Sequence, residues 1–264
     1  MTPTVASDVS ADLQELVDLV FAGLTKDFKT LIEDYKWRDQ GEDKKAGETL
    51  VLRQKLFNDW DKDPDTAAFK MLTWGFNAWR AKKYLASDWL PSFVNTNNVL
   101  ATIKRFCHGT SASAAATWRL SSWTKVLTVR RPDQYFILDS RVCNGINDCL
   151  ANSDKCSVRR CFPILARAAA AEKKRRAKKL KEKLLQQRHA EIRIDCETLY
   201  LDLYCRMMPL IADKIEKQLS TTKFVLFENE PTITLSELKK RFTFNPVPHL
   251  VEMALFQKGD LAHD

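Results

Sequence analysis

The sequence predicts a mostly α-helical fold. Only 7 glycines and 9 prolines occur in 264 residues, and stretches rich in Leu, Ala, Lys and Glu recur along the chain. Apolar residues repeat at helical spacing, whereas the alternation of apolar and polar residues that is typical of strands is scarce. The hydrophobic share of 45% is enough for a substantial core. These features argue against a β-barrel and against a Rossmann sheet.

The first residues predict a flexible end followed by two helices. Residues 1–10 are rich in Ser, Thr and Asp, a composition typical of frayed termini. An apolar repeat then predicts a helix that starts near Asp8 or Ser10, and a second apolar stripe continues over about 28–35. The polar residues 39–43 interrupt this stripe and predict a loop.

Three more helices are expected before the middle of the chain. Their apolar patterns cover about residues 48–60, 65–86 and 97–107. Asp63-Pro64-Asp65 predicts the start of the second helix, because an aspartate oxygen accepts free amide hydrogens and proline preorganises a first helical turn.

The next helix leads to a conspicuous aspartate. It runs from about Thr110 to Thr128 and places apolar residues on one face, with Lys125 on a neighbouring polar arc that faces either a cleft or water. Pro132 ends this helix, and a connection rich in apolar residues follows. Asp139 comes next, at the N-cap position of another helix, where the helix dipole and free amides stabilise a negative charge.

Positive charge is concentrated on one segment of the second half. Eight basic and two acidic residues lie between Glu172 and Lys183. An alanine- and lysine-rich run predicts a long exposed helix over 166–193, which either contacts phosphates or is a solvated connector. Residues 194–264 then return to a core, with a helix over about 194–211, short extended pieces near 224–235 and a terminal helix over about 248–257.

These elements divide the chain into four parts. We expect a flexible N-terminus at 1–10, a large helical region at 11–165, a basic connecting helix at 166–193 and a C-terminal helical region at 194–264 that packs back on the core. No apolar run approaches the length that crosses a bilayer, and the N-terminus lacks a signal-peptide pattern. We therefore expect a cytoplasmic protein without a membrane partner.

Two stretches resemble the active-site region of the helix-hairpin-helix DNA glycosylases, and among them bacterial proteins of the 8-oxoguanine glycosylase type. They are Ser-Ser-Trp-Thr-Lys-Val-Leu at 121–127 and Tyr-Phe-Ile-Leu-Asp-Ser-Arg-Val at 135–142, with a weaker echo at 250–256. The resemblance implies a two-lobed helical fold with a cleft between the lobes. It also implies a monomeric enzyme that flips a damaged or modified base out of double-stranded DNA and cleaves its N-glycosidic bond.

Asp139 and Lys125 are the catalytic candidates. Breaking an N-glycosidic bond develops positive charge on the sugar, which an ionised Asp139 can stabilise while it orients a water or an amine. Its simpler role is a plain helix cap, and the two roles are compatible. Lys125 is the nucleophile if a Schiff base forms and the abasic product is nicked, which needs an amine made less basic by burial or by cations such as Arg130 and Arg131. A water nucleophile remains equally open.

The hairpin departs from the family pattern. The family's lysine follows a glycine-rich hairpin whose position falls near Ser121, and here Trp118-Arg119-Leu120-Ser121-Ser122 has no glycine to cradle a phosphate. DNA contacts are therefore expected from side chains instead. The candidates are Arg119, Ser121, Ser122, Arg130, Arg131, Arg141, Lys173, Lys174, Arg175 and Arg176.

Aromatic and sulfur-containing residues are the remaining candidates for binding roles. Trp37 and Trp118 are candidates for a base pocket, with ordinary core packing as the alternative. Seven cysteines fit a reduced compartment. Cys143, Cys149, Cys156 and Cys161 have no Cys-x-x-Cys spacing, which favours buried thiols over a metal or an iron–sulfur cluster. We expect no cofactor and no metal.

The sequence leaves two questions open: which purpose a glycosylase of this kind would serve, and whether the protein is an enzyme at all. Excision of a base fits either DNA repair or phage defence, in which the target is a modified base in invading DNA. The alternative is a non-catalytic helical DNA-binding or scaffold protein that uses only the basic helix. Asp139 discriminates between these classes, because only the enzyme depends on its charge.

Overall fold

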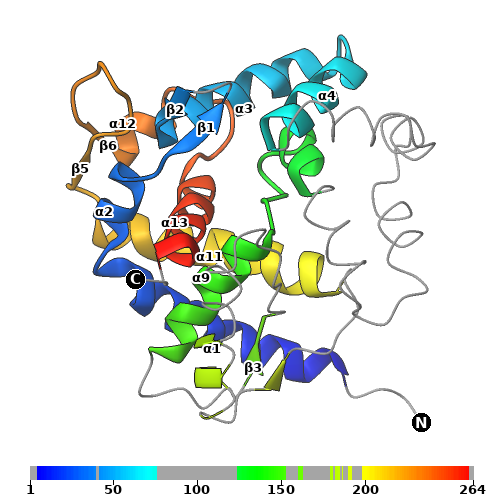
Figure 1. The fold of residues 1–264 in the computed structure, drawn as a ribbon, viewed down its shortest axis with the longest axis vertical. Coiled ribbons are helices and arrows are strands. Elements are labelled where there is room, and N and C mark those ends of the chain that lie inside the picture. The colour runs from blue at the N-terminus through cyan, green and yellow to red at the C-terminus, as the bar shows by residue number, and fades with distance from the viewer. Residues whose placement is uncertain are drawn as a thin grey trace.

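A computed structural model shows a mostly helical protein with a few very short strands, as the composition predicts (Figure 1). It describes residues 5–39, 42–75, 124–152, 160–162, 179–180, 182–184, 186, 190–191 and 198–261.

The chain begins with two helices and a small hairpin. Helix α1 (Val5–Thr25) starts before the expected position, so residues 5–10, expected to be a flexible end, belong to the helix. Helix α2 (Phe28–Glu33) follows as predicted. Residues 39–43 are expected to form a loop, but Asp39 lies in β1 (Trp37–Asp39) and residues 42–43 lie in β2 (Glu42–Lys44), which pairs antiparallel with β1. Residues 40 and 41 lie outside the described residues. Three-residue strands are too short to show an alternating pattern in the sequence.

Helices α3 (Ala46–Trp60) and α4 (Pro64–Gly75) confirm the next two predicted helices up to residue 75. Asp63 accepts a hydrogen bond from the Thr66 amide at 3.0 Å, which fits the expected start of α4. The helix expected over 97–107 lies outside the described residues.

The middle of the chain follows the prediction closely. Residues 124–130 are helical, residues 132–134 form a turn, and residues 135–139 belong to no helix or strand. We call residues 131–139 the Asp139 loop. It ends at α9 (Ser140–Ala151), the helix predicted after Asp139.

The long exposed helix predicted over 166–193 is only partly correct. Helical residues occur between 179 and 186, but the segment ends in β4 (Ala190–Glu191), which pairs in parallel with β3 (Arg160–Cys161). Leu180 and Leu184 are buried in a small cluster with Ala151 and Cys161, so this part of the segment packs on the protein. Leu180 and Leu184 are one helical turn apart, and their burial was not expected because charged residues surround them in the sequence.

The C-terminal region is compactly packed from residue 198 onward. A π-helix, η1 (Thr198–Tyr204), runs into α11 (Cys205–Gln218), which contains Pro209. Proline has no amide hydrogen to donate, and the wider turns of η1 lie just before it. Of the apolar stripe predicted over about 194–211, Leu199, Leu203, Met207 and Ile211 are buried, and Leu210 is 38% exposed. Ile194 lies outside the described residues.

Two short strands and two helices complete the fold. The predicted extended pieces form β5 (Lys223–Phe224) and β6 (Ile233–Thr234), an antiparallel pair. They are followed by α12 (Leu235–Lys239), whose start carries a capping box between Thr234 and Glu237, and by α13 (Val247–Leu261), the predicted terminal helix.

Helix α13 lies at the centre of the described residues, against α2, α3, α9 and α11 (Figure 1). It crosses α9 at unusually close range. A Cβ atom on Gly145 of α9 would lie 2.0 Å from the Leu255 carbonyl oxygen, and one on Gly259 of α13 would lie 1.9 Å from the Arg141 carbonyl oxygen. Glycine at these two positions lets the two backbones touch.

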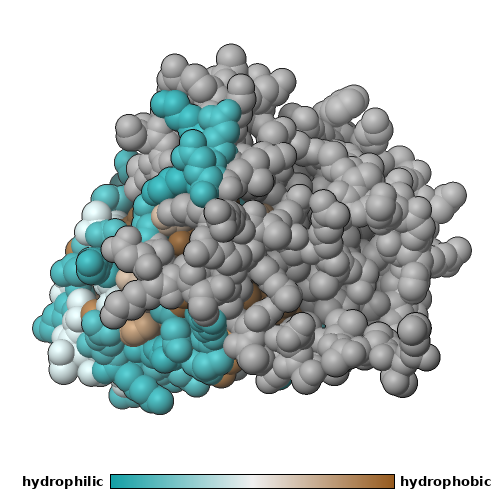
Figure 2. Space-filling view, turned by 90° about the horizontal axis from the view of Figure 1, so that it is seen from below, coloured by the Kyte–Doolittle hydropathy of each residue, from teal (hydrophilic) through white to brown (hydrophobic). Residues whose placement is uncertain are grey.

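The surface of the described residues is largely polar. On the face shown in Figure 2, their hydrophobic side chains show only in small separate areas. Among the residues whose side chains the structure describes, Val51 and Leu210 are the large hydrophobic ones that are exposed. No helix of these ranges combines the length and the apolar character needed to cross a bilayer.

Candidate active site

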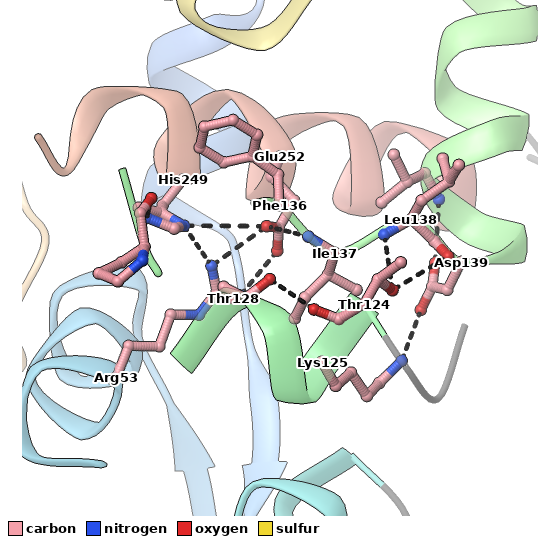
Figure 3. Close-up of polar contacts among 12 residues, drawn as sticks. Arg53, Thr124, Lys125, Thr128, Phe136, Ile137, Leu138, Asp139, His249 and Glu252 are labelled. Atoms are coloured by element: carbon pink, nitrogen blue, oxygen red, sulfur yellow. Dashed lines mark hydrogen bonds and ion pairs between the residues drawn. The ribbon is translucent and has the colours of Figure 1, made fainter. Parts of the chain in front are cut away.

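The structure brings Lys125 and Asp139 together. Lys125 lies in the helical residues 124–130, and its Nζ is 3.7 Å from Oδ2 of Asp139, which immediately precedes α9 (Figure 3). Lys125 is 2% exposed, so of the two environments left open by the sequence, water is excluded. An amine and a carboxylate thus share one nearly dry site.

Asp139 is the cap of α9, as predicted. Its Oδ1 accepts hydrogen bonds from the amides of Arg141 at 3.0 Å and Val142 at 3.1 Å. The other oxygen, Oδ2, faces Lys125. The cap therefore fixes the carboxylate through one oxygen and leaves the second oxygen directed at the amine.

Burial makes Lys125 a weaker base than a lysine in water. Desolvation lowers the pKa of Lys125, and the negative charges of Asp139 and Glu252 offset part of this effect. The cations that lower this pKa further are Arg53 and Arg141, whereas the sequence pointed to Arg130 and Arg131. Arg141 lies two residues after Asp139, whereas Arg53 comes from α3, a distant part of the sequence that the motif around Lys125 could not indicate.

A small pocket lies beside the pair, with room for about one water molecule. Its walls combine aromatic rings with charged groups, and the described residues that line it are Tyr35, Trp37, Arg53, Lys125, Ile137, Asp139, Glu252, Met253 and Phe256. The predicted pocket residue Trp37 is among them, partly buried, with its ring centroid 5.2 Å from that of Phe256. Trp118 lies outside the described residues.

Side chains hold the Asp139 loop in place on several sides. The Tyr200 hydroxyl donates to the Phe136 carbonyl at 2.9 Å, and the Tyr204 hydroxyl donates to the Ile137 carbonyl at 2.7 Å. On the other side, the Leu138 amide donates to Oγ1 of Thr124 at 3.1 Å. The loop belongs to no sheet of the described residues, and these side chains satisfy its buried backbone groups.

Sequence reasoning missed a buried trio beside the pair: Arg53, His249 and Glu252. Arg53 donates to both oxygens of Glu252, at 2.6 and 3.2 Å, and Glu252 in turn accepts from the Ile137 amide at 2.8 Å. Burial, the largest single effect, raises the pKa of Glu252, but the Arg53 charge and the side-chain hydrogen bonds to this carboxylate together outweigh it, and the pKa is lowered. A single acidic residue in the apolar run 250–256 was the available signal, because buried charges are almost always paired.

The predicted DNA contacts are only partly described. Arg130, just before the Asp139 loop, is half-buried, and Arg131, the first residue of the loop, is exposed. Arg141 pairs with Asp260 at 3.2 Å, and its guanidinium lies 4.6 Å above the Phe256 ring, at the edge of the pocket. The remaining candidates, Arg119, Ser121, Ser122, Lys173, Lys174, Arg175 and Arg176, lie outside the described residues.

The described cysteines that the sequence singled out are buried thiols. Cys143, Cys149 and Cys161 are each at most 3% exposed, whereas Cys156 lies outside the described residues. Burial raises the pKa of Cys149 to about 12, which keeps the thiol protonated. Within the described ranges, no three His, Cys, Asp or Glu residues are grouped closely enough to hold a metal ion.

Comparison of the chain with protein-family models, with curated proteins and with solved structures finds no match. Functional inference therefore depends on the geometry of the Lys125–Asp139 site and on the sequence around it.

Proposed function

We propose that this protein is a DNA N-glycosylase of the helix-hairpin-helix type, which excises a flipped base with Asp139 and Lys125 as catalytic residues. The observation that carries the proposal is the nearly buried ion pair of Lys125 with Asp139. Asp139 is held as the cap of α9, and aromatic rings line the pocket beside the pair. Two lobes around a cleft are part of the proposal. The resemblance of residues 121–142 to the family supports it, as does the net charge of +8 in a protein that would bind a polyanion.

The carboxylate suits the charge that develops during the reaction. As the bond between the sugar C1′ and the base breaks, its electron pair leaves with the base, and C1′ becomes positive. Oδ2 of Asp139 would face C1′, because Oδ1 is committed to the amides of α9. The cap holds the carboxylate in place before the reaction, so little reorganisation is needed.

Water and Lys125 are both competent nucleophiles in this geometry. In the water route, the water oxygen bonds to C1′, Asp139 takes the water proton, and the Lys125 ammonium supplies the proton of the departing base. In the lysine route, Nζ of neutral Lys125 bonds to C1′ as the bond to the base breaks, and the base takes a proton from water. Asp139 then takes a proton from the new ammonium and passes it to the ring oxygen O4′, so that the ring opens to a Schiff base, which permits nicking of the strand. The lowered pKa of Lys125 makes the neutral amine accessible.

The pocket is much smaller than a nucleobase, since it has room for about one water molecule. A flipped base would therefore need the ring walls to move apart. Trp37 and Phe256 are the rings that could then stack on the base, since both line the pocket next to Asp139. The choice between repair and phage defence rests on which base this opened pocket accepts.

Asp139→Asn tests the proposal. Asparagine keeps an oxygen for the amides of Arg141 and Val142 but lacks the charge. We expect base release from DNA carrying a panel of modified bases to fall by about 100-fold or more, with unchanged DNA affinity. Asp63→Asn, at the start of α4, is the matched control and should release base normally. Base release that survives in Asp139→Asn would refute Asp139 as the catalytic carboxylate. A native protein that binds DNA but releases no base from any substrate of the panel would favour a DNA-binding scaffold.

Borohydride trapping separates the two nucleophiles. If Lys125 attacks, reduction of the Schiff base will link protein and DNA covalently, and Lys125→Met will abolish the adduct. Lys258→Met is the control, because Lys258 is also paired with an aspartate, Asp148, at 3.4 Å. Base release without a trapped adduct would assign the attack to water.

A further inference from the structure

Two side chains on one face of α13 contact the Asp139 loop, one near each end of the loop. We call these two contacts the grip of α13 on the loop. Near the start of the loop, Nε2 of His249 lies 2.9 Å from the Pro132 carbonyl oxygen. Near its end, Oε2 of Glu252 accepts from the Ile137 amide at 2.8 Å. His249 and Glu252 are three residues apart, so they project from the same face of the helix (Figure 3). The peptide before Asp139 is thus tied directly to α13.

Arg53 of α3 contacts both of these side chains, His249 and Glu252. One of its nitrogens, Nη1, lies 2.8 Å from Nδ1 of His249, and Nη2 donates to Oε1 of Glu252 at 2.6 Å. Arginine can only donate, so Nδ1 of His249 accepts, and Nε2 carries the proton that it donates to Pro132. His249 is therefore neutral, in agreement with the lowering of its pKa by burial and by the Arg53 charge.

The trio is too deeply buried to be explained by stability alone. Arg53, His249 and Glu252 are 1%, 0% and 3% exposed. Desolvation of two charges consumes most of what their attraction provides, and apolar residues of similar size often stabilise such a site at least as well. The feature that an apolar replacement could not reproduce is the acceptor for the Ile137 amide.

The same residues border the reactive pair. Arg53 and Glu252 line the pocket with Lys125 and Asp139. Only Leu138 separates Ile137, the residue that Glu252 holds, from Asp139. A shift of the Ile137 amide would therefore carry the Asp139 carboxylate with it, away from Lys125 or from the amides of α9.

We propose that His249 and Glu252, joined by Arg53, are positioning residues that hold the Asp139 loop at the distance from α13 at which Asp139 meets Lys125. The consequence for catalysis rests on the proposed function. The grip itself does not, because it is a property of the protein without DNA.

Two double variants separate positioning from packing. Arg53→Met with Glu252→Leu removes both charges and the acceptor for the Ile137 amide. Arg53→Met with Glu252→Gln also removes both charges but keeps an amide oxygen as that acceptor. Neither leaves an unpaired buried charge, so both are expected to fold. Glu33→Leu is the control, because Oε1 of Glu33 accepts from a distant backbone amide, that of Val225, at 2.8 Å.

Amide hydrogen exchange measures, without any substrate, how firmly the backbone of residues 132–139 is held in place. We expect faster exchange there in the Met/Leu variant than in the Met/Gln variant, and native exchange in Glu33→Leu. Equal exchange in the two double variants would overturn the proposal, whatever their activity.

The rate of single-turnover base release at saturating DNA measures the effect of the loop position on catalysis. We expect the Met/Leu variant to be slower by about 100-fold with unchanged DNA affinity, and the Met/Gln variant to recover most of the rate. Equal rates in the two double variants would overturn the catalytic part of the proposal. If the native protein releases no base, the proposed function fails, and hydrogen exchange alone decides on the grip.

Discussion

Lys125 is the residue whose protonation state links stability with reactivity. Burial lowers the pKa of Lys125 in the folded protein, whereas a lysine in the unfolded chain has a pKa of about 10.4. Below that pH the unfolded chain binds the proton more readily than the folded protein does. The lysine therefore costs folding free energy increasingly as the pH falls from about 10.4 toward its folded pKa.

Lys125→Met removes this titration. We expect the free energy of unfolding of the native protein to decrease relative to that of Lys125→Met as the pH falls from about 10 to about 7. Urea unfolding at several pH values measures the difference. Lys258→Met, which removes a partly exposed lysine, controls for the loss of a positive charge elsewhere. A difference for Lys125→Met that is independent of pH would contradict a buried, less basic amine.

The sequence predicted the part of the site that depends on neighbours along the chain. The cap role of Asp139 could be predicted because its amide partners are two and three residues away. The direction of Lys125 stayed open because Asp139 meets it only after the chain turns. Arg53 and Glu252 are 199 residues apart, and no local pattern encodes a contact of that separation.

At the scale of elements, the crossing of α9 and α13 sets the position of Asp139, which caps α9, relative to His249 and Glu252, which project from α13. Asp139 caps α9, Glu252 projects from α13, and the distance between these helices depends on Gly145 and Gly259. An alanine at either position would push the helices apart, since a Cβ there meets a backbone oxygen at about 2 Å. The crossing therefore sets how far the carboxylate lies from its support.

Gly145→Ala tests this crossing through the sign of its effect. In an exposed helix, glycine to alanine stabilises by about 1 kcal/mol. Here we expect destabilisation by about 1–3 kcal/mol, because overpacking forces the backbones apart, together with a loss of base release. Chemical denaturation measures the free energy of unfolding. Gln257→Ala on α13 is the control, and a stabilising Gly145→Ala would show that the helices can separate freely.

Helices were easier to predict than the short strands or η1. Helices α3, α9 and α13 span 12 residues or more, long enough for apolar residues at helical spacing, a cap residue or a sustained apolar run to indicate them. Two- and three-residue strands such as β1 and β4 show no period, and their pairing comes from tertiary contacts. The π-helical turns of η1, with Tyr200 and Tyr204 directed at the loop, leave the same apolar pattern as an α-helix would.

At the scale of the whole molecule, the expected partner is a polyanion. The proposed function requires binding to DNA, with which a net charge of +8 is compatible, and the charge run at Lys173, Lys174, Arg175 and Arg176 is the densest part of that charge. Each basic residue that neutralises a phosphate releases counterions, so the dependence of affinity on salt reflects how many phosphates the protein neutralises.

Replacing those four basic residues with glutamine tests whether they neutralise phosphates. We expect weaker DNA binding and a shallower plot of log affinity against log salt, by up to about 0.9 for each phosphate that is no longer neutralised. Fluorescence anisotropy at several salt concentrations measures both. The same number of glutamines at Lys214, Lys217, Lys239 and Lys240 controls for net charge. Unchanged affinity and slope would leave the charge run as a solvated connector.

The grip of α13 on the Asp139 loop also has a consequence for the order of events during protein synthesis. Ile137 and Glu252 are 115 residues apart, so a nascent chain carries Lys125 and Asp139 long before it carries the helix that holds their loop. Contacts of such long range form late in folding. An unfinished chain would thus contain Lys125 and Asp139 without the support of α13. If the protein is the proposed glycosylase, excision would begin only after the C-terminal helix has docked.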